Sequence, residues 1–272
     1  MGGAAIKRLT LAKIKQFEIS LPPLPEQRHI ADVLDRAEAL RAKRRAALAE
    51  VEALPQAIFL NLFGDIATNP KGWPMVPVSS FVSRFEGGRS MDSDSNDAEL
   101  TRNRILRISA VTTCYFKPDE TKPVPDEYDP PVAHFVIPGD LLFSRANTSE
   151  LVGAVALVPK CAGNFPLPDN LWRFVWRDDS KVEPRYVWAL FQTPAVRREI
   201  ARRATGTSGS MKNISQEKLF RIEVPLPAID VQREFSSRVA GVEKLKAAQH
   251  ASLAELDALF ASLQHRAFHG EL

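Results

Sequence analysis

The polar residues best suited to specific chemistry lie in the segment Phe143–Ser149, whose sequence is FSRANTS. This segment carries a guanidinium at Arg145, an amide at Asn147 and several hydroxyl side chains. Arginine can bond guanine through two hydrogen bonds, asparagine can bond adenine in the same way, and hydroxyls reach bases or phosphates. The segment therefore indicates a loop that reads nucleic acid, although a solvated turn fits its composition equally well. The candidate residues are Arg145, Asn147, Thr148 and Ser149.

Two other segments have a composition that suits contact with phosphate. Residues 204–212 are rich in glycine and small hydroxyl side chains and end in a lysine. They predict a flexible loop whose backbone amides could approach phosphate, or only a linker. Residues 88–90 are similar to the segment Phe143–Ser149 but are a weaker candidate. The arginine-rich segment 197–203 predicts a basic helix face, which is solvated by default and phosphate-facing in the sharper interpretation. The first two segments contribute the candidates Arg89, Ser90, Thr207, Ser208 and Lys212.

Several patterns are similar to fragments of catalytic sites. Residues 129–132 (DPPV) resemble the Asp-Pro-Pro-aromatic motif of amino-methyltransferases, but the aromatic residue is missing and no glycine-rich cofactor turn occurs. Residues 119–122 contain the Glu-x-Lys end of a metal-dependent nuclease site without its preceding aspartate on a strand. The 5 histidines and 2 cysteines are scattered and indicate neither a metal site nor a nucleophile–base pair. We therefore predict no catalytic residue, no metal site and no cofactor of the chain's own.

Composition narrows the class of protein further. With 272 residues, 44% hydrophobic and 25% charged, the chain has ordinary globular values. The longest apolar run, Leu151–Val158, is too short to span a bilayer, and Lys7 and Arg8 interrupt any secretory pattern. The net charge of +3 is spread along the chain, so it predicts no basic arm. We expect a soluble cytoplasmic protein with reduced cysteines and no membrane partner.

The elements that must position these residues are organised by an internal repeat. Residues 6–22 align without a gap on residues 211–227, an offset of 205, and the match continues into the segments that follow. Each copy begins with an alternating segment that predicts a short strand, at residues 17–21 and 222–226, and that ends at proline. A long helix follows in each copy. The chain is therefore a repeat, an insert and a repeat.

Both predicted helices carry an apolar stripe whose spacing alternates between three and four residues, as in a coiled coil. Arg44 and Gln249 occupy the same stripe position in the two copies, where a polar residue commonly fixes register. Such helices are too long for a small domain to bury, so we expect them to pair with one another, within or between chains, rather than on separate cores. The predicted pairing residues are Ile30, Val33, Leu40, Arg44, Val51, Leu54, Val242, Leu245, Gln249, Leu256, Leu259 and Leu263.

The insert has the composition of a compact α+β domain. It is rich in β-branched and aromatic residues and is interrupted by turns. Its tryptophans are interpreted as core residues rather than as platforms for bases. The expected strands are residues 105–110, 140–144, 153–158 and 171–175, and the expected helices are residues 186–192 and 195–203.

Together these residues are similar to the specificity subunits of type I restriction–modification systems. The resemblance is carried by the junction LPPLPEQR at residues 21–28, by the repeat ending at residues 211–227, and by a glycine and an acidic residue that close both helices. Gly72-Trp73 resembles the start of a target recognition domain, and residues 138–144 resemble its central strand. The second junction departs from the pattern, with AIDV in place of PLPE.

The resemblance implies an α+β fold in which one target recognition domain is flanked by two long α-helices that form an antiparallel coiled coil. The expected parts are a terminal strand remnant and linker (1–23), the first helix (24–63), the recognition domain (64–228) and the second helix (229–272). In the family, two recognition domains each read half of a bipartite DNA target, and the paired helices set the distance between the half-sites. Methyltransferase subunits, which hold S-adenosylmethionine, dock on the helices, and a restriction subunit joins them.

The resemblance also implies that this chain holds one complete recognition domain. We therefore expect a half-length or N-terminally truncated, non-catalytic subunit that associates as a homodimer and reads a symmetric bipartite site in double-stranded DNA. Two other classes stay open. A stand-alone DNA modification enzyme or nuclease would need its own cofactor or metal pocket. A coiled-coil adaptor would bind protein through its insert.

Overall fold

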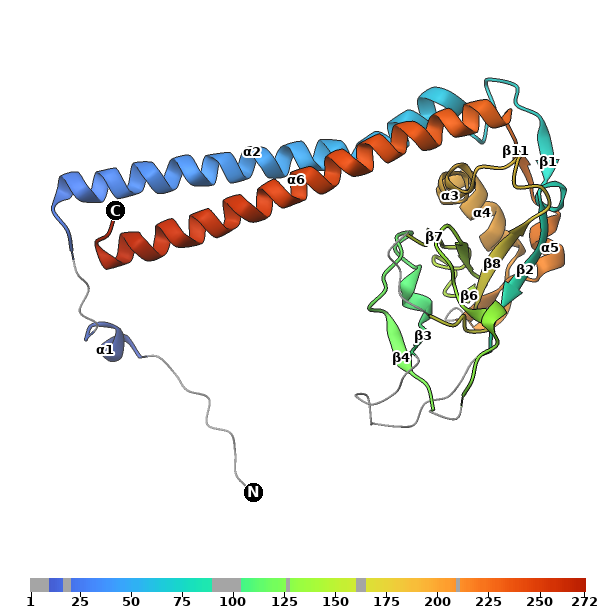
Figure 1. Cartoon of the computed structure of the whole chain (residues 1–272), viewed down its shortest axis with the longest axis horizontal. Coiled ribbons are helices and arrows are strands. Elements are labelled where there is room, and N and C mark those ends of the chain that lie inside the picture. Colours follow the sequence, from blue (N-terminus) through green and yellow to red (C-terminus); the bar gives the residue numbers. More distant parts are fainter. Residues whose placement is uncertain (1–9, 17–20, 90–103, 126–127, 160–164, 209–210) are drawn as a thin grey trace. The chain divides into compact units, whose positions relative to one another are not determined.

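The computed structural model describes residues 10–16, 21–89, 104–125, 128–159, 165–208 and 211–272 (Figure 1). The chain divides into two compact units, of which unit 1 is residues 1–53 with 243–272 and unit 2 is residues 54–242. Most of the predicted N-terminal strand lies outside the described residues, and Leu21, its described residue, is exposed and not in a strand.

Two long helices dominate unit 1 and continue into unit 2. They are α2 (Leu24–Phe63) and α6 (Ile229–His269), and a short helix, α1 (Leu11–Ile14), precedes them. Proline suits the start of α2 because the first amides of a helix have no intrahelical acceptor. Gly64 and Gly270 follow the two helices with φ of 79° and 69°, the left-handed conformation that closes a helix and that glycine adopts without strain. The glycine and acidic pair at each helix end is therefore a stop signal.

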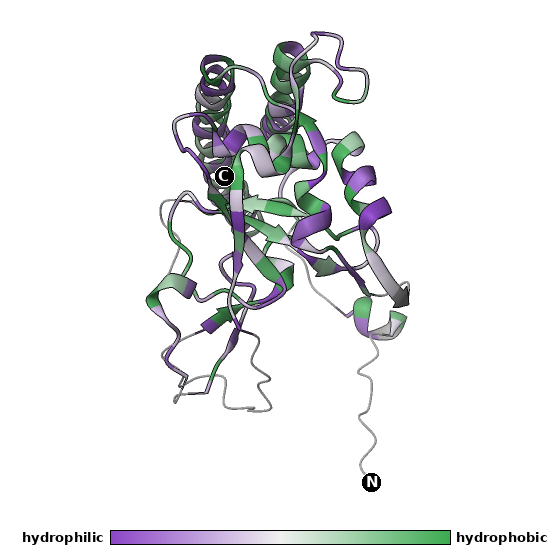
Figure 2. Cartoon of the chain, turned by 90° about the vertical axis from the view of Figure 1, so that its right-hand side faces the viewer, coloured by the Kyte–Doolittle hydropathy of each residue, from purple (hydrophilic) through white to green (hydrophobic). Residues whose placement is uncertain are grey.

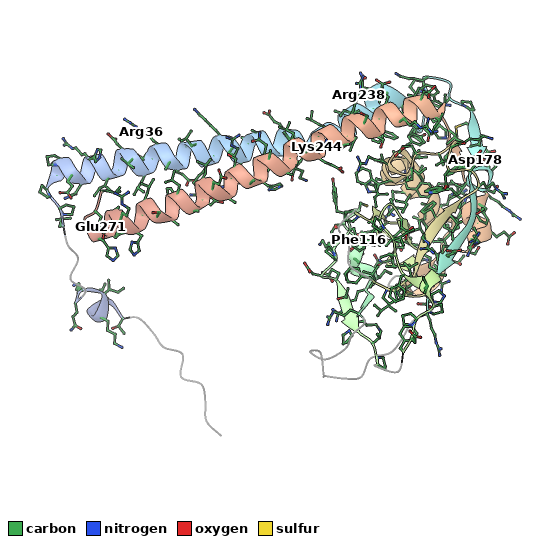
Figure 3. The ribbon with its side chains drawn as sticks, in the orientation of Figure 1. Arg36, Phe116, Asp178, Arg238, Lys244 and Glu271 are labelled. Carbon is green, nitrogen blue, oxygen red and sulfur yellow. The ribbon has the colours of Figure 1, made fainter. Side chains whose placement is uncertain are left out.

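The helices of unit 1 run antiparallel. Arg41 Nε donates to Asp257 Oδ1 at 2.6 Å, and Lys246 Nζ lies 3.1 Å from Glu52 Oε1, so the partner residue number falls as the α2 number rises. The Arg41 guanidinium also lies 4.3 Å from the centre of the Phe260 ring. Polar and apolar residues are interspersed along both helices (Figure 2), and exposed charged side chains such as Arg36 and Lys244 project from them (Figure 3).

The buried stripe differs from the predicted one at four leucines. Leu40 and Leu259 are 55% and 51% exposed, and Leu54 and Leu245 are exposed as well. Their neighbours Arg41 and Phe260 contact one another instead. The inward stripe keeps the seven-residue spacing, at Ile30, Arg44 and Val51. Its second position in the heptad lies one residue later than predicted, at Arg41 and not at Leu40. The other predicted pairing residues are partly or fully buried, namely Ile30, Val33, Arg44, Val51, Val242, Gln249, Leu256 and Leu263.

Unit 2 is built on an antiparallel sheet with strand order β2-β8-β5-β7. The strands are β2 (Val82–Gly87), β5 (Leu141–Ser144), β7 (Val155–Leu157) and β8 (Leu171–Trp176). Two helices, α3 (Pro184–Gln192) and α4 (Pro194–Arg203), lie beside the sheet (Figure 1) and bury Leu190, Phe191 and Ile200. Strands β5, β7 and β8 and both helices overlap the ranges expected from the sequence, whereas no strand was expected at β2.

Shorter elements surround this sheet. β1 (Met75–Pro77) pairs with β11 (Glu223–Pro225), and β3 (Arg104–Leu106) pairs with β4 (Thr121–Pro123). The expected strand at 105–110 therefore ends early, and 3-10 turn η2 (Ile108–Ala110) follows it. The remaining short elements are η1 (Val78–Ser80), η3 (Val132–His134) and α5 (Gln216–Phe220).

A third sheet contains the segment that was expected to be a flexible loop. β9 (Thr205–Ser208) and β10 (Met211–Asn213) form a hairpin, and β10 also pairs with β6 (Ala146–Asn147). The prediction of a flexible loop was wrong because the glycine serves close packing. A Cβ atom at Gly206 would lie 2.2 Å from the Met211 carbonyl oxygen, so glycine is what permits the two strands to approach.

The core of unit 2 includes the ends of both long helices. Phe63 of α2 lies 4.7 Å from Tyr186 of α3 and 5.6 Å from Phe235 of α6, measured between ring centroids. The Tyr186 hydroxyl donates to the Pro225 carbonyl at 2.6 Å, and burial raises its pKa above the ordinary value. Because these aromatic residues pack together, the boundaries between the two compact units fall inside the helices, near residues 53 and 242.

By length and composition alone, α2 could cross a membrane, and no other helix in the described residues meets both conditions. This is a weak indication. Phe59 and Phe63, which contribute to its apolar character, are buried in the core of unit 2.

Candidate functional site

The polar segments singled out in the sequence converge at one end of the central sheet. β2 finishes at Gly87, which lies opposite Trp172 at the start of β8, and Trp172 lies opposite Phe143 near the end of β5. The chain then continues from β5 to Arg145 and from β2 to Arg89, which is exposed. Ser90 lies outside the described residues. We call this region the sheet end and define it by residues 87–89, 144–149 and 168–172, together with the β9–β10 hairpin.

Arg145 is held firmly at the sheet end. Its backbone N–H donates to the Asn170 carbonyl and its own carbonyl accepts from Ile214 N–H, both at 3.1 Å. The guanidinium carbon lies 5.5 Å from the centre of the Trp172 ring, and its NH2 lies 3.7 Å from Asp169 Oδ2. The side chain is 34% exposed. A cation held over an aromatic ring in this way keeps a defined position while part of it still faces solvent.

Asn147 and Lys212 are neighbours through strand pairing, although they are far apart in the sequence. They are register partners in β6 and β10. Asn147 Oδ1 accepts from Thr148 N–H at 2.9 Å and its Nδ2 donates to Ser144 Oγ at 3.3 Å, while Lys212 Nζ donates to the Gly206 carbonyl at 3.1 Å. The structure thus brings together two segments that were predicted separately.

The remaining candidates lie on the same elements. The Thr148 carbonyl accepts from Val152 N–H at 2.9 Å, so Thr148 opens a turn, and Ser149 is exposed on that turn. Thr207 and Ser208 belong to strand β9, next to β10.

Sequence reasoning missed Asp169 and Asn170, which complete the sheet end. They form the turn between Pro168 and β8, and Gly88 N–H donates to the Pro168 carbonyl at 3.1 Å. A Cβ atom at Gly88 would lie 1.7 Å from the Leu167 carbonyl oxygen, so glycine is required for the two segments to meet. The signal that could have found this turn is the pair Asp-Asn directly before an apolar strand.

The basic helix α4 contains one acid, Glu199, which pairs with two of its four arginines. Glu199 Oε1 lies 2.8 Å from Arg202 NH2 and 2.6 Å from Arg203 Nε, and hydrogen bonding to these arginines lowers the pKa of Glu199 to about 2. Arg197 NH2 donates to the Glu150 carbonyl at 2.5 Å, and burial lowers the pKa of Arg197. The ion pairs favour the solvated interpretation of this face over a phosphate-facing one.

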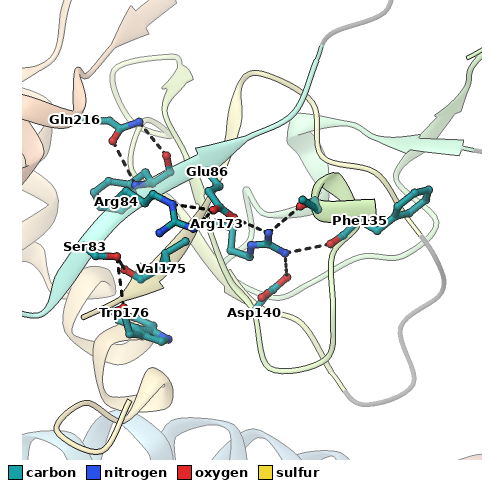
Figure 4. A network of polar contacts seen from close by, with 11 residues as sticks. Ser83, Arg84, Glu86, Phe135, Asp140, Arg173, Val175, Trp176 and Gln216 are labelled. Carbon is teal, nitrogen blue, oxygen red and sulfur yellow. Dashed lines mark hydrogen bonds and ion pairs between the residues drawn. The ribbon is translucent and has the colours of Figure 1, made fainter. Parts of the chain in front are cut away.

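A buried ion network braces the strands that lead to the sheet end (Figure 4). Arg173 of β8 is 12% exposed, and its NH2 lies 2.6 Å from Glu86 Oε2 of β2 while its NH1 lies 3.2 Å from Asp140 Oδ2. The hydrogen bond from Arg173 lowers the pKa of Glu86, whereas burial raises the pKa of Asp140 against the opposing effect of the Ile137 amide and Arg173. The carboxylates are therefore engaged in fixing the strands.

The fragments that resembled catalytic motifs lie in other surroundings. The DPPV segment leads into η3, where Val132 is exposed, as in a surface loop. Glu120, from the Glu-x-Lys fragment, accepts a hydrogen bond from Ser109 Oγ at 2.6 Å. Within the described ranges, no group of three or more His, Cys, Asp or Glu side chains could hold a metal ion.

The helix pair of unit 1 is built around a local two-fold relation. Arg44 NH1 donates to Gln249 Oε1 at 2.6 Å, and these residues are related by the repeat offset of 205. The same offset relates Arg41 to Lys246 and Glu52 to Asp257. The Arg41–Asp257 and Lys246–Glu52 ion pairs are therefore equivalent in the two copies, each with one basic and one acidic residue. A residue meets its own repeat equivalent only on a two-fold axis, so this axis passes through the Arg44–Gln249 contact.

Comparison with known proteins agrees with this arrangement. A family model described as "Type I restriction modification DNA specificity domain" matches residues 1–53. The chain is 30% identical over 291 aligned residues to the type I restriction enzyme EcoKI specificity subunit of Escherichia coli strain K12, an alignment that covers 99% of this chain and 61% of that protein. This chain is similar to the type I restriction specificity subunits.

Another curated specificity subunit is less similar to this chain. The EcoEI specificity subunit of Escherichia coli is 25% identical over 202 residues, which cover 70% of this chain and 33% of that protein. The chain thus spans about three fifths of the first relative and one third of the second.

Two solved structures share the fold of this chain. The HsdS subunit from Thermoanaerobacter tengcongensis has a TM-score of 0.53 at 20% identity, covering 100% of this chain and 65% of that one. A chain from a structure of the complex assembly and conformational transition of a type I restriction–modification system has a TM-score of 0.59 at 22% identity, covering 93% and 62%.

Proposed function

We propose that this chain is a specificity subunit that reads one half-site of a bipartite double-stranded DNA target. The observation that carries this proposal is the convergence of Arg145, Asn147 and Lys212 at the sheet end. They come from two segments that are distant in the sequence, and strand pairing makes them neighbours. Arginine and asparagine are suited to base edges, and lysine is suited to phosphate. A mixed set of this kind is what a sequence-reading surface requires.

The helix pair supports a second part of the proposal, a spacer between half-sites. The local two-fold axis at Arg44 and Gln249 relates the two ends of the pair to one another. A recognition domain at one end would therefore have a symmetric counterpart at the other, at a distance fixed by the helices. We propose that the pair acts as an antiparallel coiled coil in this role, with the polar contact at its centre setting the register.

The two copies of the helix start differ in how deeply they are buried. In the second copy, Phe235 and Val239 are buried in the core of unit 2. Their equivalents Ile30 and Leu34 are only partly buried. We propose that a second recognition domain of the same kind covers this part of α2.

Self-association as a homodimer is a further part of the proposal. The exposed leucines of the helix pair, among them Leu40, Leu245 and Leu259, offer apolar surface to another chain. Within one chain α2 already pairs with α6, so a dimer is not needed to complete that contact. Measurement of molar mass in solution tests this part directly.

The partner subunits follow from the family. We propose that the chain is a non-catalytic scaffold, that methyltransferase subunits dock on the helix pair and hold S-adenosylmethionine, and that a restriction subunit joins this cytoplasmic assembly. The relatives are named as specificity subunits of type I restriction enzymes, and this supports the proposal.

Selection from a library of random DNA duplexes tests the proposed function. The full chain, alone and with its methyltransferase subunit, should enrich a motif of two short half-sites separated by a fixed gap. A coiled-coil adaptor would enrich no sequence, and a stand-alone enzyme would modify or cleave the duplexes without any partner. Either result would contradict the proposal.

A further inference from the structure

We infer that Arg145 reads a guanine in the major groove of the half-site, and that Trp172 and Asp169 position its guanidinium for that contact. The inference rests on the proposed DNA-reading function and adds to it the base that is read and the residues that decide it. The two positioning residues precede or begin strand β8, so the geometry depends on the sheet and not on a loose surface loop.

Trp172 provides a rigid platform for the arginine. Its ring is nearly parallel to that of Phe143, with an interplanar angle of 16° and centroids 6.2 Å apart, and it contacts Phe85 at 5.6 Å. The indole is buried, so neighbouring strands fix its orientation. An arginine that already lies on such a ring loses less conformational freedom when it meets a base, which favours binding.

Asp169 orients the guanidinium without sequestering it. The 3.7 Å between Arg145 NH2 and Asp169 Oδ2 is too long for a hydrogen bond but short enough for electrostatic attraction. The N–H groups of Arg145 therefore stay able to donate to a base. The carboxylate also repels phosphate, so it disfavours use of Arg145 in contacts that ignore sequence.

Two buried polar atoms without a hydrogen-bond partner lie on neighbouring residues at this place. They are Arg145 Nε and Asn170 Oδ1, two of five such side-chain atoms in the described part of the chain. Their residues are joined by the hydrogen bond from Arg145 N–H to the Asn170 carbonyl. Most buried polar groups in folded proteins are paired, so two unpaired atoms on bonded neighbours indicate a site that completes its bonding when a polar ligand binds.

Arg145 is a better base reader than Asn147 or Lys212 because the side chains of those two residues are engaged. The Asn147 amide bonds Thr148 and Ser144, and the Lys212 ammonium bonds the Gly206 carbonyl. Of the four bases, guanine presents two acceptors, O6 and N7, to the major groove, and the arginine fork matches that pair.

The test compares full-length variants with the wild type in duplex selections, in the presence of the methyltransferase subunit. Wild-type protein should enrich a half-site with at least one invariant guanine. Arg145→Ala and Arg145→Lys should both reduce discrimination at that one base pair by roughly 5- to 150-fold, because lysine cannot form the two parallel bonds. Arg221→Ala is the matched control, since Arg221 is exposed, pairs with Glu217, and lies next to Ile222 at the other end of the domain from Gly87.

Asp169→Asn separates positioning from a structural role. Removal of the carboxylate should lower discrimination at the same base pair and at the same time raise affinity for unrelated duplex DNA, because repulsion of phosphate is lost. A residue that only supports the fold would lower both affinities together. Thermal unfolding of each variant establishes that it is folded.

The outcomes distinguish the two levels of the account. If the wild type enriches no sequence, the proposed function fails. If it enriches a motif and Arg145→Ala keeps full discrimination at every base pair, or loses affinity equally for all sequences, DNA reading stands and the role of Arg145 is overturned. Equal losses of target and non-target affinity in Asp169→Asn overturn the positioning role.

Discussion

The two copies of the repeat begin with the same local contact and end in different surroundings. Gln27 Nε2 donates to the Pro22 carbonyl at 2.7 Å, and its equivalent Gln232 Nε2 donates to the Pro227 carbonyl at 2.7 Å. Gln232 is fully buried and its Oε1 also accepts from Glu183 N–H at 3.0 Å, whereas Gln27 is only partly buried. This contact between glutamine and the proline carbonyl therefore forms both where the glutamine is buried and where it is partly exposed. Packing against a recognition domain is a separate property of the second copy.

The largest difference in stability between the two copies should come from replacing a core aromatic residue of the second copy. Phe235→Ala removes a ring that packs on Phe59 and Phe63, and the cavity should cost about 3–5 kcal/mol of unfolding free energy. Its equivalent in the first copy, Ile30→Ala, should cost about 1 kcal/mol, because Ile30 is partly exposed. Denaturant unfolding of both variants measures the difference. Equal losses would mean that the two helix starts are packed alike.

The junction glutamines give a smaller contrast. Gln232→Ala should cost about 1–3 kcal/mol, because the buried amide of Glu183 loses its acceptor. Gln27→Ala should cost about 0.5 kcal/mol, since solvent can replace the lost contact. A larger loss at Gln27 than at Gln232, in the same unfolding experiment, would contradict the account.

The pH dependence of stability tests the ion pairs of Glu199 in the recognition domain. The pKa of Glu199 is lowered to about 2 by Arg202 and Arg203, so its ion pairs contribute stability above pH of about 4.5, and this contribution is lost as the pH falls toward 2. Because the pair is at the surface, we expect Glu199→Gln to lose only about 1 kcal/mol at neutral pH. The difference from wild type should vanish near pH 2. A difference that persists there would show that packing, and not charge, is responsible.

The smallest effects test the two-fold relation within the helix pair. Glu52→Ala and Asp257→Ala remove equivalent acids from the Lys246 and Arg41 pairs, and each should cost about 0.5 kcal/mol. The local symmetry predicts losses of similar size in both variants. A loss confined to one of them would indicate that the second contact does not form in solution.

The elements that sequence analysis found best were those with strong local signals. The prolines before Leu24 and the glycine after Phe63 define α2, and the apolar runs of β5, β7 and β8 define the central sheet. Their formation depends on residues close in the sequence. The repeat placed Arg44 and Gln249 at the same stripe position of two helices that were expected to pair, and in the structure these residues contact one another.

The parts that were missed depend on distant partners. Glycine and serine made residues 204–212 look like a loop, yet β9 pairs with β10, and β10 pairs in turn with β6 at Asn147. Leu40 fitted the heptad spacing, but the inward position is one residue later, at Arg41, which contacts Phe260 of the other helix. Asp169 belongs to no motif, and only the fold brings it beside Arg145. Local patterns therefore predicted the elements, and tertiary contacts determined the site.

Cross-linking across the two-fold axis tests the central claim most directly. In a background with Cys114 and Cys161 replaced by serine, Arg44→Cys and Gln249→Cys would be combined and treated with a short bismaleimide. The account predicts a cross-link within one chain in high yield, because the side chains of these residues meet at 2.6 Å. The pair Arg36→Cys and Gln249→Cys, displaced by about two turns of α2, should react poorly. Failure of the first pair to react within one chain would contradict the antiparallel spacer on which the account depends.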